Sequence, residues 1–191
     1  MNAKQITFAL MMGALGTALF AISYSLGQIG YSVALDFSLI AALIAGFYGG
    51  PIVGFVSGLF VGILPGVMFG PFGFGGMLGL VGLPFGKALS GSSAGLIAKG
   101  MKLGQKPRSA LLAIPAVLLA YVPECIFTYA YFVFLQGFEA GGATFFVFIL
   151  PKALLEVSII SVLMAALMGN SGFSNFVRAH FTQMKNKEKQ R

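Results

Sequence analysis

The sequence predicts an all-α fold, a polytopic membrane protein with six transmembrane helices, and composition is the first reason. Of the 191 residues, 58% are hydrophobic and only 9% are charged, whereas a soluble domain carries about 25% charged residues. A chain this short cannot bury so much apolar surface within one soluble globule. The apolar runs are also long and continuous, whereas the strands of a membrane barrel alternate in polarity. These features exclude a soluble enzyme, a disordered tail and a disulfide-based scaffold.

Glycine, proline and charged residues divide the chain into six apolar segments. In order, these are Ile6–Leu26, Val33–Tyr48, Ile52–Met68, Met77–Ala98, Ala110–Leu135 and Thr144–Met168. The first is long enough to cross a bilayer, and we expect it to be retained rather than cleaved. The second stops at Gly49-Gly50-Pro51. Because the second and third segments are short and separated by this tight turn, five helices is the alternative.

The third, fifth and sixth segments contain glycine and proline residues at informative positions. The third carries a glycine at every fourth position from Gly54 to Gly66, and a glycine- and phenylalanine-rich loop at 69–76 separates it from the fourth. The loop's phenylalanines either close over a ligand or anchor the loop at the membrane interface. The fifth segment contains Pro115 and Pro123, and the sixth contains Pro151. Such prolines kink a membrane helix and can shape a cavity.

The positive charges predict the orientation. Ten of the 12 Lys and Arg residues lie before the first segment, between the fourth and fifth, or after the sixth. Since cations favour the cytoplasmic side, we expect both termini to be cytoplasmic. The formal net charge of +7 therefore indicates topology rather than a nucleic-acid partner. We expect residues 1–175 to form a single membrane domain and residues 176–191 to form a basic cytoplasmic tail.

Four ionisable residues fall within the apolar segments, namely Lys87, Glu124, Lys152 and Glu156. Each costs roughly 2.5–3.5 kcal/mol at the centre of a membrane helix, so their presence needs a reason. A fifth, Asp36, lies at the outer mouth of the second helix, where capping and the helix dipole are sufficient explanation.

The spacing of these residues predicts a pocket open to the exterior. Residues three and four apart share a helix face. One such face of the fifth helix presents Tyr121, Glu124, Thr128 and Tyr131, and one face of the sixth presents Thr144, Phe148, Lys152 and Glu156. The alternative is purely structural: two lysines balance two glutamates, with Lys152 and Glu156 forming an i,i+4 pair. A ligand pocket is compatible with such pairs.

No grouping of side chains predicts catalysis, a metal site or a cofactor. The single cysteine, Cys125, lies in an apolar run, and the single histidine, His180, lies in the polar tail. No paired aspartates and no Ser or Cys nucleophile with a histidine fall at membrane depth.

Small residues recur along the first helix as Ala9-x-x-x-Gly13 and Ala14-x-x-x-Ala18. Stripes of this kind let another helix approach closely, although many serve packing within one chain.

Taken together, residues 5–170 resemble the substrate-binding S-component of an energy-coupling factor (ECF) transporter. The resemblance is carried by the chain length, the six helices, the small-residue stripe, the basic loop after the fourth helix and three sequence segments. Those segments are Leu35-Asp-Phe-Ser38, Gly46-Phe-Tyr-Gly-Gly-Pro-Ile-Val-Gly54 and Pro151-Lys152-Ala-Leu-Leu-Glu156.

The resemblance implies high-affinity binding of a vitamin or vitamin precursor at a multi-pass protein of a prokaryotic cell membrane. It implies no enzymatic activity, and as partners a transmembrane coupling subunit and two cytoplasmic ATPase subunits. By position, the partner-facing residues would be Ala9, Gly13, Ala14 and Ala18. The substrate-binding residues would be Lys87, Tyr121, Glu124, Thr128, Phe148, Lys152 and Glu156.

The ligand stays open at this point. Two acidic residues suit an amine or amidine, such as a thiamine-precursor pyrimidine, whereas Lys152 suits a carboxylate or ring carbonyl, as in biotin or a flavin. The alternative function is an ion-gradient-driven secondary transporter of a small molecule. An intramembrane enzyme and a structural membrane subunit are further alternatives.

Overall fold

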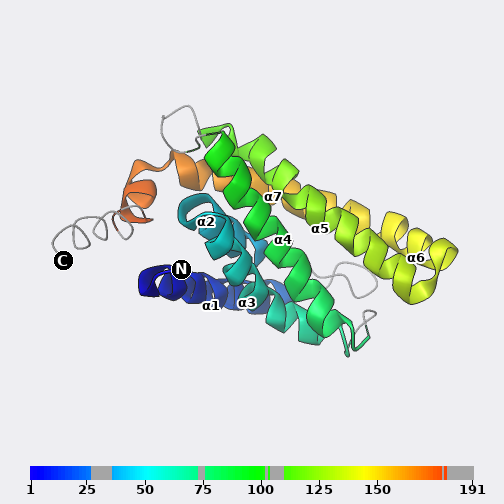
Figure 1. Cartoon of the computed structure of the whole chain (residues 1–191). Coiled ribbons are helices and arrows are strands. Elements are labelled where there is room, and N and C mark those ends of the chain that lie inside the picture. The colour runs from blue at the N-terminus through cyan, green and yellow to red at the C-terminus, as the bar shows by residue number, and fades with distance from the viewer. Residues whose placement is uncertain (27–35, 73–75, 102, 104–109, 178, 180–191) are drawn as a thin grey trace.

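The computed structural model describes residues 1–26, 36–72, 76–101, 103, 110–177 and 179, and the regular secondary structure within those ranges is helical (Figure 1). The helices are α1 (Ala3–Ser25), α2 (Leu39–Gly49), α3 (Pro51–Phe69), α4 (Gly79–Gly100), α5 (Ala113–Gln136), α6 (Phe138–Thr144), the π-helix η2 (Phe145–Ile149) and α7 (Leu150–Gly169). Each of the first five predicted segments overlaps one helix, and the sixth overlaps η2 and α7. The second segment was predicted from Val33, which lies outside the described residues, and α2 begins only at Leu39. The short helix α6 was not predicted.

Two local signals determine where helices begin. A capping box opens α1: the side chain of Asn2 accepts the backbone N–H of Gln5, and the side chain of Gln5 accepts that of Asn2, both at 3.0 Å. This box places the start of the helix three residues before the predicted one. Gly50, at φ 89°, separates α2 from α3. Since this positive φ strains residues with a Cβ, glycine allows the tight turn, and the two segments are separate helices.

Glycines bring α3 and α4 into direct backbone contact. A Cβ added at Gly54 would lie 2.1 Å from the carbonyl oxygen of Gly91, and one added at Gly58 would lie 2.4 Å from that of Lys87. Further along, a Cβ at Gly62 would lie 2.3 Å from Cα of Pro84. The four-residue glycine repeat therefore faces α4 along three turns, as small-residue stripes do in membrane bundles.

The short helix α2 lies at the centre of the bundle. Its residues from Ala41 to Ala45 are almost completely inaccessible to solvent. It packs against α1, α3, α4 and α7, and Figure 1 shows it between α1 and α4. The end of α2 also contacts residues that follow α7 in the chain, since Tyr48 Oη lies 2.9 Å from Ser174 Oγ. Val177 is also buried in the core.

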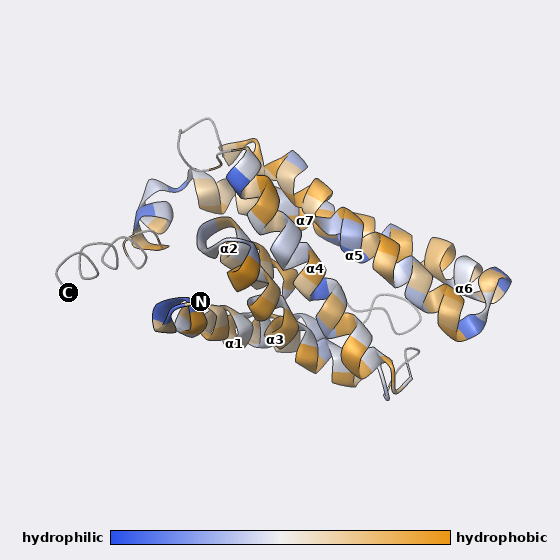
Figure 2. Ribbon diagram, viewed as in Figure 1, coloured by the Kyte–Doolittle hydropathy of each residue, from blue (hydrophilic) through white to orange (hydrophobic). Residues whose placement is uncertain are grey.

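The outer surface is apolar, as expected of a protein surrounded by lipid. Large hydrophobic side chains are exposed on α1, α3, α5 and α7, and Figure 2 shows that hydrophobic residues occur along the length of the helices. Four helical stretches are long and apolar enough to cross a membrane: Ala3–Ser25, Pro51–Phe69, Ala113–Gln136 and Phe138–Gly169. The 11-residue α2 is a shorter apolar helix. The structure thus fits a membrane protein, whereas six complete spans and the position of the termini remain predictions.

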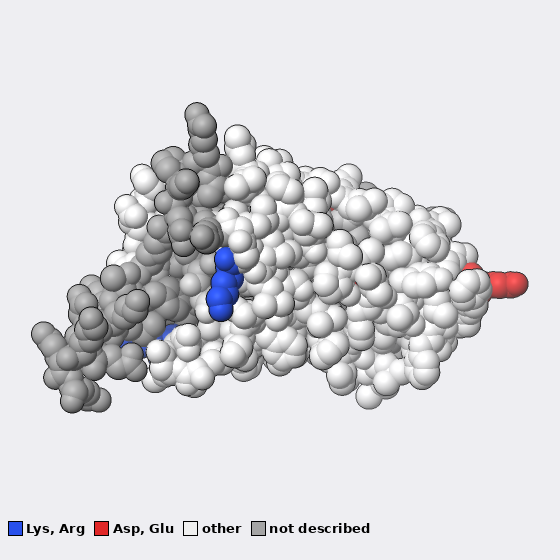
Figure 3. All heavy atoms as spheres, turned by 45° about the horizontal axis from the view of Figure 1, so that its top comes forward, with Lys and Arg blue, Asp and Glu red and all other residues white. Residues whose placement is uncertain are grey.

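Charged residues on the visible face lie toward the ends of the molecule. In Figure 3 a broad zone without Lys, Arg, Asp or Glu separates basic side chains toward one end from acidic ones at the opposite tip. Much of the basic pattern that predicts the orientation falls on Lys102, Lys106, Arg108 and Arg178, and on residues 185–191, all of which lie outside the described residues.

Candidate ligand-binding site

A cavity of about 170 Å³ lies among α2, α4, α5 and α7. This volume is well above the 10–15 Å³ that one water molecule requires by the same kind of measure. Six of the seven predicted substrate-binding residues line it, and they come from three helices: Lys87, Tyr121, Glu124, Thr128, Lys152 and Glu156. The cavity therefore lies between the two helix faces that were predicted to line a pocket.

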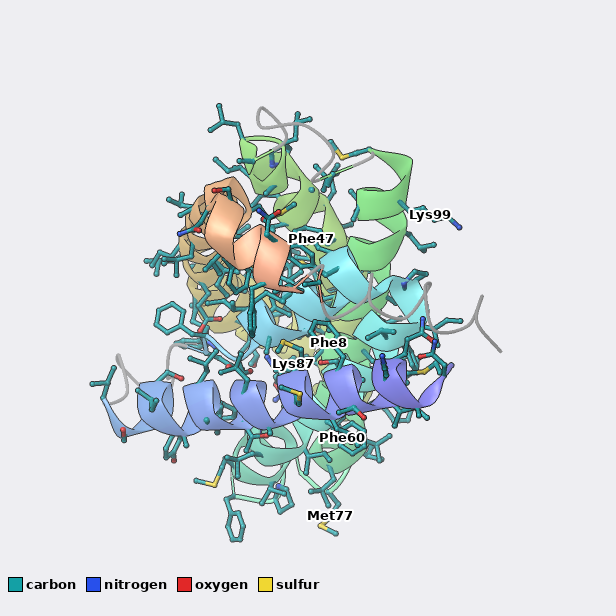
Figure 4. The ribbon with its side chains drawn as sticks, turned by 90° about the vertical axis from the view of Figure 1, so that its left-hand side faces the viewer. Phe8, Phe47, Phe60, Met77, Lys87 and Lys99 are labelled. Atoms are coloured by element: carbon teal, nitrogen blue, oxygen red, sulfur yellow. The ribbon has the colours of Figure 1, made fainter. Side chains whose placement is uncertain are left out.

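Lys87 lines the cavity from α4, at a point where the backbones of α3 and α4 are in close contact. Its ammonium lies 2.7 Å from Oδ2 of Asp36, with side-chain exposures of only 6% and 9%. Figure 4 shows Lys87 behind α1, inside the bundle, while Lys99 of the same helix projects outward. Asp36 also accepts the backbone N–H of Ser38 at 2.9 Å. Ser38 is itself the N-cap residue of α2, and no side chain caps that helix. The capping role predicted for Asp36 is therefore wrong, and its main partner is the ion pair with Lys87, which the sequence analysis did not predict.

The predicted pair on the sixth segment is confirmed. Lys152 Nζ lies 2.8 Å from Glu156 Oε1, one helical turn away. The same Glu156 oxygen accepts the backbone N–H of Asp36. Two ion pairs from distant parts of the chain are thereby joined into one cluster, which spans α4, the residue stretch before α2, and α7.

Glu124 differs from the other carboxylates of the cavity. It accepts a hydrogen bond of 2.5 Å from the hydroxyl of Ser90, and its residue exposure is 9%. Within the described part of the chain it forms no ion pair. The sequence analysis offered the pairing of two lysines with two glutamates as an alternative, but Lys87 pairs with Asp36 and only Lys152 pairs with a glutamate. The cavity wall contains three carboxylates and two ammonium groups, a formal charge of −1.

Aromatic side chains form much of the remaining wall. Tyr121, Phe127 and Tyr131 come from α5, and Phe69 comes from the end of α3. The ring of Phe127 also contacts that of Phe85, with centroids 5.2 Å apart. A pocket with flat apolar walls and a few buried polar groups is the usual architecture of a small-molecule site.

Phe148 does not join this site, and the reason is a local change of helix type. It is absent from the cavity wall and is 51% exposed, while its neighbour Ile149 lines the cavity. The four-residue spacing of Thr144, Phe148 and Lys152 shares one face only in a regular α-helix. Residues Phe145–Ile149 form a π-helix, in which the Leu150 N–H bonds the Phe145 carbonyl. Its wider turn rotates the preceding residues relative to α7. Thr144 accordingly bonds Gln136 instead, at 2.8 Å.

The predicted partner-facing stripe is divided between two surfaces. Ala9 and Gly13 are buried within the chain, and a Cβ at Gly13 would lie 2.6 Å from Cβ of Phe60 on α3. These two residues pack internally, so their assignment to a partner surface is wrong for this arrangement. Ala14 and Ala18 lie on the exposed face of α1.

Two site residues were missed from the sequence. Asp36 was attributed to helix capping alone, and Ser90 was not considered. The available signal for Ser90 was its spacing, since it follows Lys87 by three positions in an apolar helix and so shares its face.

Two further observations bear on function. Within the described ranges, no three His, Cys, Asp or Glu side chains are grouped so as to hold a metal ion. No protein-family model, curated protein or solved structure matches the chain.

Proposed function

We propose that this protein binds a vitamin or vitamin precursor for uptake, as the S-component of an ECF-type transporter in a prokaryotic cell membrane. The observation that supports this most is the cavity itself: five charged side chains and five aromatic rings surround about 170 Å³ within an apolar helical bundle. Charges are expensive at membrane depth and mark functional sites by default.

The position of the cavity agrees with this role. It is lined by residues near the end of α3, in the first half of α4 and in the middle and second half of α5. Under the predicted orientation, these parts lie away from the cytoplasmic termini, so a ligand would enter from outside. The exposed side of α1, with Ala14 and Ala18, would then face the coupling subunit, and two cytoplasmic ATPases would supply the energy.

The test is isothermal titration of the purified full chain in detergent against a panel of vitamins and vitamin precursors, without ATP. We expect one member to bind, and we expect Lys152→Ala to weaken its binding. The absence of any binder would contradict the proposal.

An ion-gradient-driven transporter is the second candidate, because Glu124 and Glu156 are buried carboxylates at a cavity. Uptake into proteoliposomes distinguishes the two. An S-component reconstituted without its partners is expected to give no concentrative uptake. Uptake by this chain alone that is abolished by an uncoupler would favour the second candidate.

A further inference from the structure

We propose that the ligand of this cavity is a small organic monocation with a planar ring, and that Glu124 is its counter-ion. The inference rests on the proposed function and narrows it to a ligand class. It selects between the two chemistries that the sequence left open, a cationic amine or amidine and an anionic or carbonyl-bearing ligand.

The first step is the charge of the wall. Lys87 and Lys152 are each ion-paired, at 2.7 and 2.8 Å, with Asp36 and Glu156. Within the described residues Glu124 has no ion pair of its own: it accepts a hydrogen bond from the neutral hydroxyl of Ser90. The lysines whose charges reach it, Lys87 and Lys152, are each bonded to another carboxylate. A buried carboxylate whose charge is only partly offset is costly, and a cation placed beside it reduces that cost. The formal charge of −1 is balanced by one positive charge on the ligand.

The second step excludes an anion. Because an ammonium has three N–H donors, a carboxylate ligand could share either lysine, but only by lying beside the carboxylate already bonded to it. It would also add a second uncompensated negative charge to a wall that has one already. Both effects oppose binding, because like charges repel strongly in a desolvated site.

The third step excludes a simple metal cation. Hard divalent cations require six or more oxygen ligands, whereas no three carboxylates of the described residues are grouped so as to hold a metal ion. The ring of Phe127 lies near Glu124, since both approach a Cβ built at Gly86, and Tyr121 lines the same cavity. Aromatic faces attract organic cations and stack against planar rings. Glu124 also lies against Gly86, since a Cβ added at Gly86 would be 3.3 Å from Cγ of Glu124. The absence of a side chain at Gly86 leaves room along this wall.

Three probes of nearly equal shape separate charge from fit: benzamidinium, benzamide and benzoate. Their binding to the full chain in detergent is measured by ligand-observed NMR. We expect benzamidinium to bind tightest, about tenfold or more above benzamide, because a charge-assisted hydrogen bond provides that difference. Benzoate is expected to bind more weakly than either. Equal or tighter binding of benzamide or benzoate, or no binding of any probe, would overturn the inference.

The matched variants are Glu124→Gln and Glu139→Gln. Glutamine keeps the shape of Glu124 and an oxygen that can accept from Ser90, and Glu139 is exposed on α6. In Glu124→Gln the preference for benzamidinium over benzamide should fall to about onefold, whereas Glu139→Gln should retain it. Because both probes are compared on the same sample, a partly unfolded variant does not mimic the effect. A preference unchanged in Glu124→Gln would overturn the inference.

The proposed function can survive the failure of this inference. If a neutral or anionic vitamin binds in the titration described above, the uptake role stands and the cationic ligand class is wrong. If no vitamin binds and the three probes also fail, both are wrong.

Discussion

The ammonium of Lys87 and the carboxylate of Asp36 form an ion pair of 2.7 Å in the interior of the bundle. The pair fixes α4 to the residues that precede α2. Burying two charges is not an efficient way to stabilise a fold, because their desolvation opposes their attraction. Its consequence for the cavity is that one lysine is already neutralised before any ligand arrives.

Removing one partner of this pair should destabilise the protein. Lys87→Met leaves Asp36 buried without a counter-charge, and we expect a loss of about 3–5 kcal/mol in the free energy of unfolding. Chemical denaturation in detergent, followed by circular dichroism, measures it. Lys99→Met is the matched control, because Lys99 lies on the same helix and is exposed.

The double variant Asp36→Asn/Lys87→Met should recover most of the lost stability, because no charge is then left alone. If Lys87→Met is no more destabilising than Lys99→Met, the buried pair does not exist as described.

Glycine contacts between α3 and α4 give a second prediction. In Gly91→Ala the new methyl group would lie 2.3 Å from the Gly54 carbonyl oxygen, whereas a Cβ at Gly100 meets nothing within 4 Å. Overpacking of this kind costs typically 1–3 kcal/mol, and the obstructing atom here belongs to the backbone. We expect Gly91→Ala to lower the thermal unfolding temperature clearly, and Gly100→Ala to change stability by less than about 0.5 kcal/mol. Equal effects of the two substitutions would show that the helices are not in such close contact.

Helix boundaries and helix contacts could be predicted in part from the sequence, because glycine and proline residues mark them. Gly50 ends one helix and Pro51 begins the next, and the glycine repeat from Gly54 onward indicates close helix packing before any neighbour is known. The capping box of Asn2 and Gln5 was also visible, although it was not used to place the start of α1. The sequence could not show that α2 is buried among its neighbouring helices. Every segment is apolar, so a buried helix and a lipid-facing helix do not differ in hydropathy.

Because of the π-helix, we expect Phe148 and Tyr121 to differ in their importance for binding. Phe148→Ala should leave the affinity for the ligand unchanged within about twofold, because the Phe148 side chain is exposed and does not line the cavity. Tyr121→Ala should weaken binding by tenfold or more, since it removes an aromatic wall. Titration with the vitamin that binds the wild type measures both. A large loss in Phe148→Ala would mean that the regular helical spacing holds in the functional state.

The two halves of the α1 stripe should behave differently. Gly13→Leu forces a side chain into Phe60 of α3 and should lower stability by 1–3 kcal/mol or more. Ala18→Leu lies on the exposed face and should leave stability and ligand binding intact. If that face meets the coupling subunit, Ala18→Leu should still reduce ATP-dependent uptake in cells that express the complete transporter. Normal uptake by a stable Ala18→Leu variant would exclude this face as the partner surface.

The site was predictable only where the helices are regular. Glu124, Lys152 and Glu156 were found because they are charged residues within apolar segments, and helical spacing then added Tyr121 and Thr128 on α5. Phe148 was misplaced because a π-helix has no clear sequence signature. Asp36 was undervalued because its ion-pair partner is 51 residues away in the chain, and local reasoning cannot anticipate such a contact.

Native mass spectrometry of the full chain, incubated without ATP with an equimolar panel of vitamins and vitamin precursors, tests the central claim most directly. We predict a one-to-one complex with one member of the panel, lost in Glu124→Gln and retained in Glu139→Gln. Detection of only the unliganded protein across the panel, for the wild type as for both variants, would contradict it.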